Sequence, residues 1–316
     1  MTAEEYCYRH PDVSTGVHCT RCDRPICPRC MTAASVGFHC PECLAEGRKT
    51  TRVARTVYGG RVRSFSGRVG PVTGALIGIN VVMFIVTSAG GGLSLFGNGG
   101  SSSLFLRLAL NPAAVGHGEW YRMVTAMFLH FNLLHIASNM YALYLIGPSL
   151  EAALGRSRFL ALYFLAGVGG SALSVAFGPM SETAAGASGA IFGLFAAFYV
   201  VARHQRLQTG GIAGTIVINL VFSLTFRGVI DWRGHVGGLI AGGLVMVVFA
   251  YAPRGRRRNL LQAAGVAATA VLVVGVGLVG VHRAHKDCPV FSASYLDSGY
   301  VETDTGCPIA PPGFSQ

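Results

Sequence analysis

Three short stretches of the sequence carry polar side chains that could activate a serine nucleophile. The first holds His135 and Asn139, which are four residues apart and therefore share one face of a helix. The second is Gly-Ala-Ser-Gly at 186–189, and the third places His235 just before a pair of glycines. A serine hydroxyl becomes a strong nucleophile when a neutral imidazole within hydrogen-bond distance accepts its proton. Ser188 and His235 supply that pair and predict acyl-transfer chemistry.

Acyl transfer also needs hydrogen-bond donors aimed at the oxygen that becomes negatively charged. The backbone N–H of Ser188 at a helix N-terminus and the side chains of His135 and Asn139 could supply them. The flanking glycines allow close approach, and Phe192, one turn after the serine, can stack on the imidazole of His235. We therefore predict Ser188 as nucleophile, His235 as general base, and His135 and Asn139 as oxyanion donors.

The elements that must position these side chains are membrane-spanning helices. The composition, with 51% hydrophobic and 12% charged residues and a mean hydropathy of +0.49, is typical of a membrane protein. Each predicted span is close to the ~20 residues that cross ~30 Å of hydrocarbon. The predicted spans are 71–89, 121–146, 159–178, 187–202, 211–226, 234–252 and 260–281. Polar groups at membrane depth are costly, so those in the second, fourth and sixth spans, which enter the membrane from the same face, are candidates for function.

The placement of the basic residues, which give the chain a net charge of +11, predicts the orientation of these spans. Basic clusters at 155–158, 203–206 and 254–258 fall on one face together with a basic linker, as the positive-inside rule expects of the cytoplasmic side. The polar N-terminus lacks the apolar core of a signal peptide. We expect a multi-pass protein of the cell membrane with a cytoplasmic N-terminus and an extracytoplasmic C-terminus. No nucleic-acid partner is expected, because the basic stretches lack interleaved aromatic residues.

Over roughly residues 70–252 the sequence resembles the rhomboid family of intramembrane proteases. The resemblance rests on the following residues: Trp120, Tyr121, Arg122, His130, His135, Asn139, Glu151, Gly155, Arg158, Phe159, the stretch 186–189, His235, Gly238 and Gly242. It implies an all-α polytopic fold, with a rhomboid-like bundle of six helices to which this chain adds a seventh C-terminal span. It also implies a Ser–His dyad without a third acid, an oxyanion hole that involves His135 and Asn139, and cleavage of single-span membrane proteins near the outer end of their helix.

Several of these residues also have structural interpretations. Asp231, four residues before His235, is interpreted as a helix cap or a loop charge. Arg122 could extend to the lipid headgroups, and Glu151 with Arg158 could form a surface ion pair.

Residues 7–43 contain metal-ligand pairs with a spacing typical of zinc sites. The pairs are Cys7 with His10, Cys19 with Cys22, Cys27 with Cys30, and Cys40 with Cys43. Eight ligands suffice for two tetrahedral zinc ions of structural type, and the short intervals favour pairing the first pair with the third and the second with the fourth. His39 could replace Cys40 as a ligand. The module resembles a B-box zinc finger.

We expect five regions along the chain. They are a zinc-binding domain at 1–46, a basic linker at 47–69, the six-span core at 70–252, a basic loop with the seventh span at 253–282, and an extracytoplasmic tail at 283–316. Cys288 and Cys307 lie in the tail, where an oxidising compartment favours a disulfide. Reduced thiols are the alternative.

The function predicted from the sequence is an intramembrane serine endopeptidase whose partners are transmembrane protein substrates and the lipid bilayer, with no cofactor for catalysis. One alternative is a catalytically inactive rhomboid-like protein that binds transmembrane clients, but it requires the loss of Ser188 or His235, and both are present. Another is a membrane-anchored docking protein whose zinc module binds a cytoplasmic protein partner.

Overall fold

The computed structural model describes residues 4–50, 55–60, 69–89, 95, 102–288, 301–302 and 307–309. The chain divides into two units, Met1–Ala54 and Arg55–Gln316. Parts of the predicted basic linker, the Gly/Ser-rich connection after residue 89 and most of the predicted tail lie outside the described residues.

The N-terminal unit is small and built around its cysteines. Strands β1 (Tyr6–Cys7) and β2 (His10–Ser14) pair antiparallel, as do β3 (Thr32–Ala33) and β4 (Phe38–His39), and helix α1 (Pro41–Thr50) follows. Six cysteines and Ile26 make up its buried core. So little apolar surface does not stabilise a folded domain without cross-links or metal.

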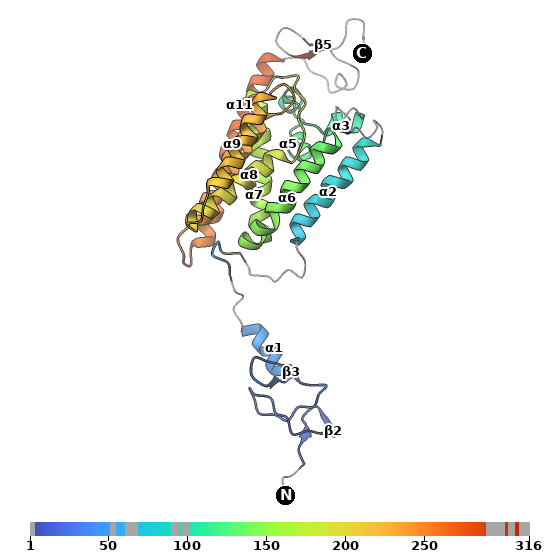
Figure 1. Cartoon of the computed structure of the whole chain (residues 1–316), viewed down its shortest axis with the longest axis vertical. Helices are drawn as coiled ribbons and strands as arrows, with labels where there is room; N and C mark the ends of the chain where they lie inside the picture. Colours follow the sequence, from blue (N-terminus) through green and yellow to red (C-terminus); the bar gives the residue numbers. More distant parts are fainter. Residues whose placement is uncertain are drawn as a thin grey trace. The chain divides into compact units, whose positions relative to one another are not determined.

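The second unit is a bundle of helices that run side by side (Figure 1). The longer helices in its described part are α2 (Pro71–Ser88), α6 (Leu133–Leu154), α7 (Arg156–Phe177), α8 (Ser188–His204), α9 (Gly210–Thr225), α10 (Trp232–Tyr251) and α11 (Arg258–Asp287). In the described residues, α2, α7, α10 and α11 are long and apolar enough to cross a membrane, and α8 and α9 are apolar but shorter. The predicted all-α polytopic fold is confirmed.

Helix α10 lies between α7 and α8 and packs extensively on both. Its glycines meet glycines of α8: a β-carbon on Gly238 would overlap the carbonyl of Gly189, and one on Gly242 would overlap the backbone of Gly193. Helices without a hydrophobic driving force between them associate through such small residues. The consequence is that α8 and α10 are in backbone contact along the length that carries the candidate site.

The prediction of a second span at 121–146 is wrong in its bounds. Helix α6 begins only at Leu133, where the Asn132 side chain accepts a hydrogen bond from the backbone N–H of His135 at 2.9 Å, and it continues to Leu154. The residues before it form short helices: α3 (Ser103–Leu108), α4 (Pro112–Gly116), α5 (Arg122–Thr125) and the 3₁₀ helix η1 (Ala126–Phe128). Part of their apolar surface, including Phe105, Val115 and Met127, is buried in a folded loop, which sequence hydropathy alone does not distinguish from a span.

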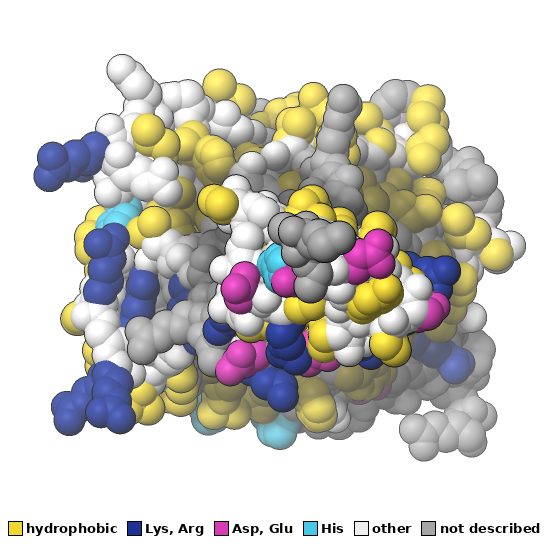
Figure 2. Space-filling model, turned by 90° about the horizontal axis from the view of Figure 1, so that it is seen from below, with side chains coloured by type: hydrophobic (Ala, Val, Ile, Leu, Met, Phe, Trp, Pro, Cys, Tyr) yellow, Lys and Arg dark blue, Asp and Glu magenta, His cyan; other side chains and the backbone are white. Residues whose placement is uncertain are grey.

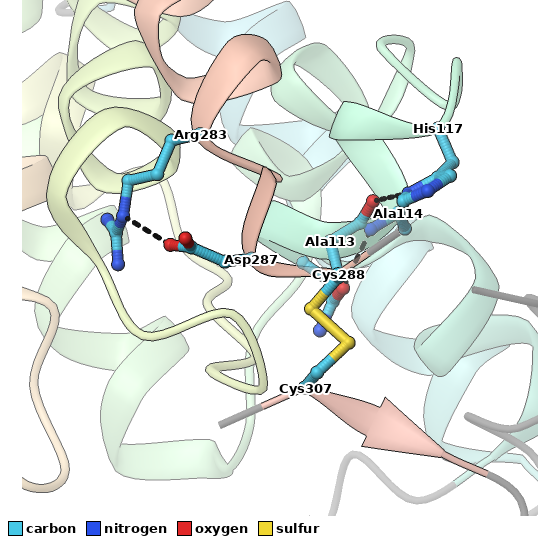
Figure 3. The surroundings of a disulfide bond; sticks show 8 residues. Ala113, Ala114, His117, Arg283, Asp287, Cys288 and Cys307 are labelled. Atoms are coloured by element: carbon cyan, nitrogen blue, oxygen red, sulfur yellow. Dashed lines mark hydrogen bonds and ion pairs between the residues drawn. A yellow bond between two sulfur atoms is a disulfide. The ribbon is translucent and has the colours of Figure 1, made fainter. Parts of the chain in front are cut away.

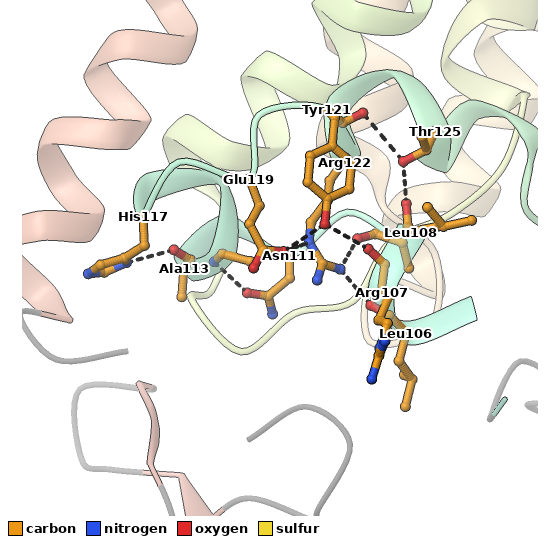
Figure 4. A network of polar contacts seen from close by, with 12 residues as sticks. Leu106, Arg107, Leu108, Asn111, Ala113, His117, Glu119, Tyr121, Arg122 and Thr125 are labelled. Atoms are coloured by element: carbon orange, nitrogen blue, oxygen red, sulfur yellow. Dashed lines mark hydrogen bonds and ion pairs between the residues drawn. The ribbon is translucent and has the colours of Figure 1, made fainter. Parts of the chain in front are cut away.

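Arg122 holds this loop together and does not extend to the headgroups (Figure 4). Its side chain is 1% exposed. It donates to the Glu119 carboxylate at 2.5 Å and to the carbonyls of Leu106 and Ala109 at 2.5 and 2.9 Å. Because a buried guanidinium needs both a counter-charge and acceptors, this set of contacts fixes the loop around one side chain.

Glu151 has a different role from the predicted ion pair with Arg158. It is fully buried in α6 and accepts hydrogen bonds from the backbone N–H groups of Val72 and Thr73 and from the Thr73 hydroxyl, at 2.8–3.1 Å. These are N–H groups of the first turn of α2, which no residue within that helix can satisfy. The carboxylate therefore caps α2 from a neighbouring helix, and Arg158 instead donates to Gln262 at 2.9 Å.

The C-terminal end of α11 is attached to the first loop. Cys288, directly after the helix, forms a disulfide with Cys307 (Figure 3). Both sulfurs are buried against Ala113 of α4. Arg283 forms an ion pair with Asp287 at 3.3 Å and also donates to carbonyls at the end of α7. Strands β5 (Val301–Glu302) and β6 (Pro308–Ile309) pair antiparallel beyond it.

Candidate active site

The beginnings of three helices converge on one cavity of about 800 Å³. Ser188 is the first residue of α8, and His135 and His235 lie in the first turns of α6 and α10. All three line the cavity, together with Asn139. A volume of this size accommodates a ligand or a short peptide segment.

Ser188 and His235 are within hydrogen-bond distance of each other. The Nε2 atom of His235 lies 2.8 Å from the Oγ atom of Ser188. The imidazole is 8% exposed and stacks on the ring of Phe192, with centroids 4.2 Å apart and planes 12° apart. The stacking that was expected from the position of Phe192 is confirmed. It restricts rotation of the imidazole and keeps Nε2 directed at the serine.

The imidazole of His135 borders the same space as the serine hydroxyl. Gly186 has a φ of +134°, and a β-carbon added to it would lie 2.8 Å from His135 Nε2 and 3.5 Å from Ser188 Oγ. Glycine is therefore needed here both for its backbone conformation and for space. The Nδ1 atom of His135 accepts a long hydrogen bond of 3.5 Å from the backbone N–H of Phe131. This places the ring proton on Nε2, which faces the serine.

Asn139 is the second predicted donor of the oxyanion site. Its side chain is 6% exposed and lines the cavity one turn after His135. Its Nδ2 atom donates one proton to the His135 carbonyl at 2.9 Å. The amide has two N–H donors, so the second is available to a group in the cavity.

Ser223 of α9 is a site residue that the sequence analysis missed. Its Oγ atom lies 2.7 Å from His235 Nδ1 and also donates to the Asn219 carbonyl at 2.6 Å. A hydroxyl has one proton, and a carbonyl can only accept. Because that proton goes to Asn219, the Ser223 oxygen accepts from Nδ1–H, and Nε2 of His235 is left with a free lone pair facing Ser188.

A sequence signal for Ser223 was available. Thr215, Asn219 and Ser223 are spaced four residues apart and so share one face of an otherwise apolar helix. Ser223 is also the only residue of α9 that is buried. Polar groups at membrane depth are candidates for function, and this rule, applied to the fifth predicted span, would have identified this face.

Two carboxylates lie at the outer rim of the cavity without contacting the imidazole. Asp231 caps α10, as one interpretation of the sequence expected, by accepting from the Gly234 N–H at 2.9 Å, and it also accepts from the Ser174 hydroxyl at 2.5 Å. Glu182 lies 3.6 Å from Arg233. Burial, and secondarily the charge of Asp231, raises the pKa of Glu182 to about 6 despite the opposing effect of Arg233. Neither acid takes the place next to His235 that Ser223 occupies.

The N-terminal unit contains two clusters that could hold metal ions. One comprises Cys7, His10, Cys27 and Cys30, and the other Cys19, Cys22, Cys40 and Cys43. Within each cluster the ligand atoms lie within 4.8 Å of one another. This is the interleaved grouping expected from the spacing, and Cys40, rather than His39, is the member of its cluster. Three thiolates with one imidazole, and four thiolates, are ligand sets that suit tetrahedral zinc.

The fold and the apolar helices define an integral, multi-pass membrane protein with a serine and a histidine paired in its interior. A model of the rhomboid domain matches residues 117–252. The chain is 37% identical over 171 residues to the rhomboid protease GluP of Bacillus subtilis (strain 168), which covers 52% of this chain and 32% of the relative. It is 32% identical over 135 residues to the putative rhomboid protease YdcA of the same organism, covering 42% and 68%. The rhomboid protease AarA of Providencia stuartii is 30% identical over 166 residues, covering 43% and 58%.

The chain belongs to the rhomboid family. The matched region spans about a third of the length of GluP and about two thirds of YdcA. The region that the family model matches, residues 117–252, contains Ser188, His235, His135, Asn139 and Ser223, whereas both candidate metal clusters precede it.

Proposed function

We propose that this protein is an intramembrane serine endopeptidase that cleaves transmembrane segments of other proteins through Ser188 and His235. The observation that carries the proposal is the distance of 2.8 Å between His235 Nε2 and Ser188 Oγ inside a cavity of a rhomboid-family bundle. A neutral imidazole in that position accepts the hydroxyl proton as the oxygen attacks a peptide carbonyl.

The reaction proceeds in two acyl-transfer steps. Attack by Ser188 Oγ on the carbonyl carbon gives a tetrahedral intermediate, while its proton moves to His235 Nε2. The imidazolium then returns this proton to the departing amine nitrogen, and an acyl-enzyme remains. A water molecule, deprotonated by His235, attacks the ester and regenerates the serine. The backbone N–H of Ser188, the Nε2–H of His135 and the free N–H of Asn139 are the donors we assign to the oxyanion.

Ser223 performs in this mechanism the orienting role that an aspartate has in a catalytic triad. By accepting from Nδ1–H, it keeps His235 in the tautomer that has a basic Nε2. A hydroxyl carries no charge, so it stabilises the imidazolium less than a carboxylate would. It also costs less to bury in a membrane helix than an ionised acid.

We orient the chain with the cavity toward the extracytoplasmic face and the N-terminal unit in the cytoplasm of a cell. The cavity is formed at the beginnings of α6, α8 and α10, and basic residues gather at the other ends of these helices and at the start of α11. Figure 2 views that basic end, where Lys and Arg side chains of the helical unit lie along one side. The positive-inside rule assigns such an end to the cytoplasm. Cleavage would then occur near the outer membrane face.

The paired serine and histidine favour the protease over the competing functions. A catalytically inactive client-binding protein has no use for an imidazole that is stacked, tautomerically fixed and hydrogen-bonded to a serine in a cavity. A docking role for the N-terminal unit remains compatible with proteolysis, since a protease can recruit a cytoplasmic partner through a separate domain.

We further propose that the two clusters of the N-terminal unit each hold one structural zinc ion. Every cluster offers four ligands, which fill a tetrahedral site and leave no position for a reacting water molecule. The metal would stabilise the unit by binding the folded form, since the ligands come together only on folding.

Replacing either member of the dyad should abolish proteolysis. Ser188→Ala removes the nucleophile and His235→Ala removes its base, so we expect no detectable cleavage of a transmembrane reporter in liposomes by either variant. Ser157→Ala, at an exposed serine near the start of α7, is the matched control and should cleave at the wild-type rate. Cleavage by Ser188→Ala at a rate near that of the wild type would refute the assignment.

Replacing one oxyanion donor should slow the reaction without abolishing it. For His135→Ala and Asn139→Ala we expect kcat to fall by about 10²–10³, the usual effect of losing one such donor, with reaction of Ser188 toward a fluorophosphonate probe weakened in parallel. Normal turnover in both variants would mean that these side chains serve only packing.

Ser223→Ala, which removes the hydroxyl, should lower kcat by about tenfold with little change in KM. This is the effect on rate of losing the free energy of one neutral hydrogen bond. Ser223→Thr should restore most of the rate because it keeps the hydroxyl. Thr225→Val is the matched control: Thr225 is exposed on the same helix and its hydroxyl likewise bonds the carbonyl four residues back. A purely structural role would instead appear as a lower melting temperature with an unchanged rate per labelled active site.

The N-terminal unit should contain two zinc ions per chain and should be dispensable for catalysis. We expect chelation to unfold this unit, as measured by circular dichroism of the isolated segment 1–54. We also expect a chain that begins at Arg55 to cleave substrate in detergent at a rate near that of the wild type. Metal analysis that gives less than one zinc per chain would exclude the proposed sites. Loss of activity in a correctly inserted truncated chain would show that the unit acts on the active site.

A further inference from the structure

A second cavity, of about 500 Å³, lies at the basic end of the helical unit, between the segment 55–60 and the turn that joins α10 to α11. Arginines from both sides line it, and among the described residues its lining includes no acidic side chain. The lining residues are Arg55, Thr56, Val57, Gly59, Arg254, Gly255, Arg258 and Asn259.

The backbone on both sides of this cavity is fixed by hydrogen bonds. The N–H of Thr56 donates to the Gly60 carbonyl at 2.8 Å, which closes a turn. Tyr58, in that turn, is 2% exposed, and its carbonyl accepts from Gln262 of α11 at 3.1 Å. The segment 55–60 is therefore a folded part of the helical unit, and it holds Arg55 at a defined place opposite α11.

Within the described residues, the three guanidinium groups have few hydrogen-bond partners. Arg55 donates to the Gly59 carbonyl at 3.2 Å, and Arg258 donates to the Val57 carbonyl at 2.5 Å. The Nε–H of Arg258 is buried and has no hydrogen-bond partner among the described residues. Arg254 forms no hydrogen bond or ion pair with any residue that the structure describes. A buried N–H without an acceptor is unfavourable, which points to an acceptor supplied by another molecule.

The described residues supply little negative charge at this end of the helical unit. Among the described residues of the helical unit, the carboxylate at this end is Glu151, which is buried and bound to α2. The ion pairs of the described helical unit, Arg122 with Glu119, Arg233 with Glu182 and Arg283 with Asp287, belong to its opposite end. The cavity also opens at the N-terminus of α11, where the helix dipole favours an anion.

We propose that this cavity binds the phosphate group of an anionic lipid headgroup through Arg55, Arg254 and Arg258. A guanidinium group can donate two parallel hydrogen bonds to the oxygens of a phosphate. Basic pockets between helices at the cytoplasmic face are suited to anionic headgroups. The cavity lies where α10 ends and α11 begins, the depth at which headgroup phosphates occur. A bound phosphate would connect the segment before α2 to the α10–α11 turn. The site is independent of the proposed proteolysis.

The remaining basic residues distinguish this site from a diffuse basic surface. Arg256 and Arg257 belong to the same turn and carry the same charge as Arg254, but they do not line the cavity. A non-specific attraction to anionic lipid would involve all of these arginines equally, because the attraction of a screened surface depends on how many charges it carries and not on which residues carry them. Binding in the cavity depends only on the arginines that line it.

The test measures binding of short-chain phosphatidylglycerol to the purified full-length protein in neutral detergent, by native mass spectrometry and by the shift in melting temperature. We expect phosphatidylglycerol to bind and stabilise and phosphatidylcholine to have no effect. The double variant Arg254→Gln/Arg258→Gln should bind about tenfold to hundredfold more weakly, the usual effect of losing charged hydrogen bonds. Arg256→Gln/Arg257→Gln removes the same charge from the same turn and should keep the wild-type affinity.

Further arms identify the ligand and guard against a folding defect. Arg254→Gln alone loses no hydrogen bond within the described protein, so it should fold normally and still weaken binding several-fold. Millimolar inorganic phosphate that displaces the lipid would identify free phosphate as a ligand of the same site, and lack of displacement would identify the headgroup. Equal loss of affinity in the Arg256/Arg257 variant, or equal binding of phosphatidylcholine by the wild type, would overturn the proposal.

Discussion

The contact between α8 and α10 is the constraint on which the candidate site depends. Ser188 and His235 lie on these two helices, and the 2.8 Å between their side chains requires that the helix backbones touch. Glycine at both facing positions, as at Gly189 and Gly238, removes the side chains that would separate them. In lipid, where apolar side chains gain little from leaving the solvent, backbone contact of this kind supplies both the packing and the geometry.

The second constraint is that polar groups within the bundle must find partners inside the protein. Glu151 satisfies the start of α2, and Asp231 satisfies the start of α10. The same requirement connects α9 to the dyad, because the one buried side chain of α9 is Ser223 and its partner is His235. Of the helices around the cavity, α9 therefore loses the least burial when it moves. A displacement of α9 away from α10 would lengthen the hydrogen bond between Ser223 and His235, which orients the proposed base.

Much of this arrangement was predictable from the sequence, and what was not has physical reasons. Long apolar runs and glycine patterns predict α2, α7, α8, α9 and α10 to within a few residues, and polar groups at one depth predict which side chains line the cavity. The start of α6 was misplaced because apolar residues near Met123 are buried in a loop. Arg122 holds that loop through hydrogen bonds to the carbonyls of Leu106 and Ala109, and hydropathy does not encode such contacts. Ser223 was missed because a serine in a membrane helix usually bonds only to its own backbone. The contact of Ser223 with His235 depends on how α9 lies against α10.

The cysteines give an argument about orientation that is independent of charge. The thiols of the N-terminal unit are grouped as metal ligands, which must be reduced to bind, whereas Cys288 and Cys307 are joined to each other. Thiolate metal sites and structural disulfides belong to opposite redox environments. In the proposed topology, in which all seven longer helices cross the membrane, the two groups of cysteines lie on opposite sides. The proposed topology puts the basic cavity and the reduced thiols on the cytoplasmic side, and the disulfide on the other side with the cavity of Ser188. Charge and redox chemistry thus both support the orientation that we propose, in which the proposed nucleophile meets its substrates near the outer membrane face.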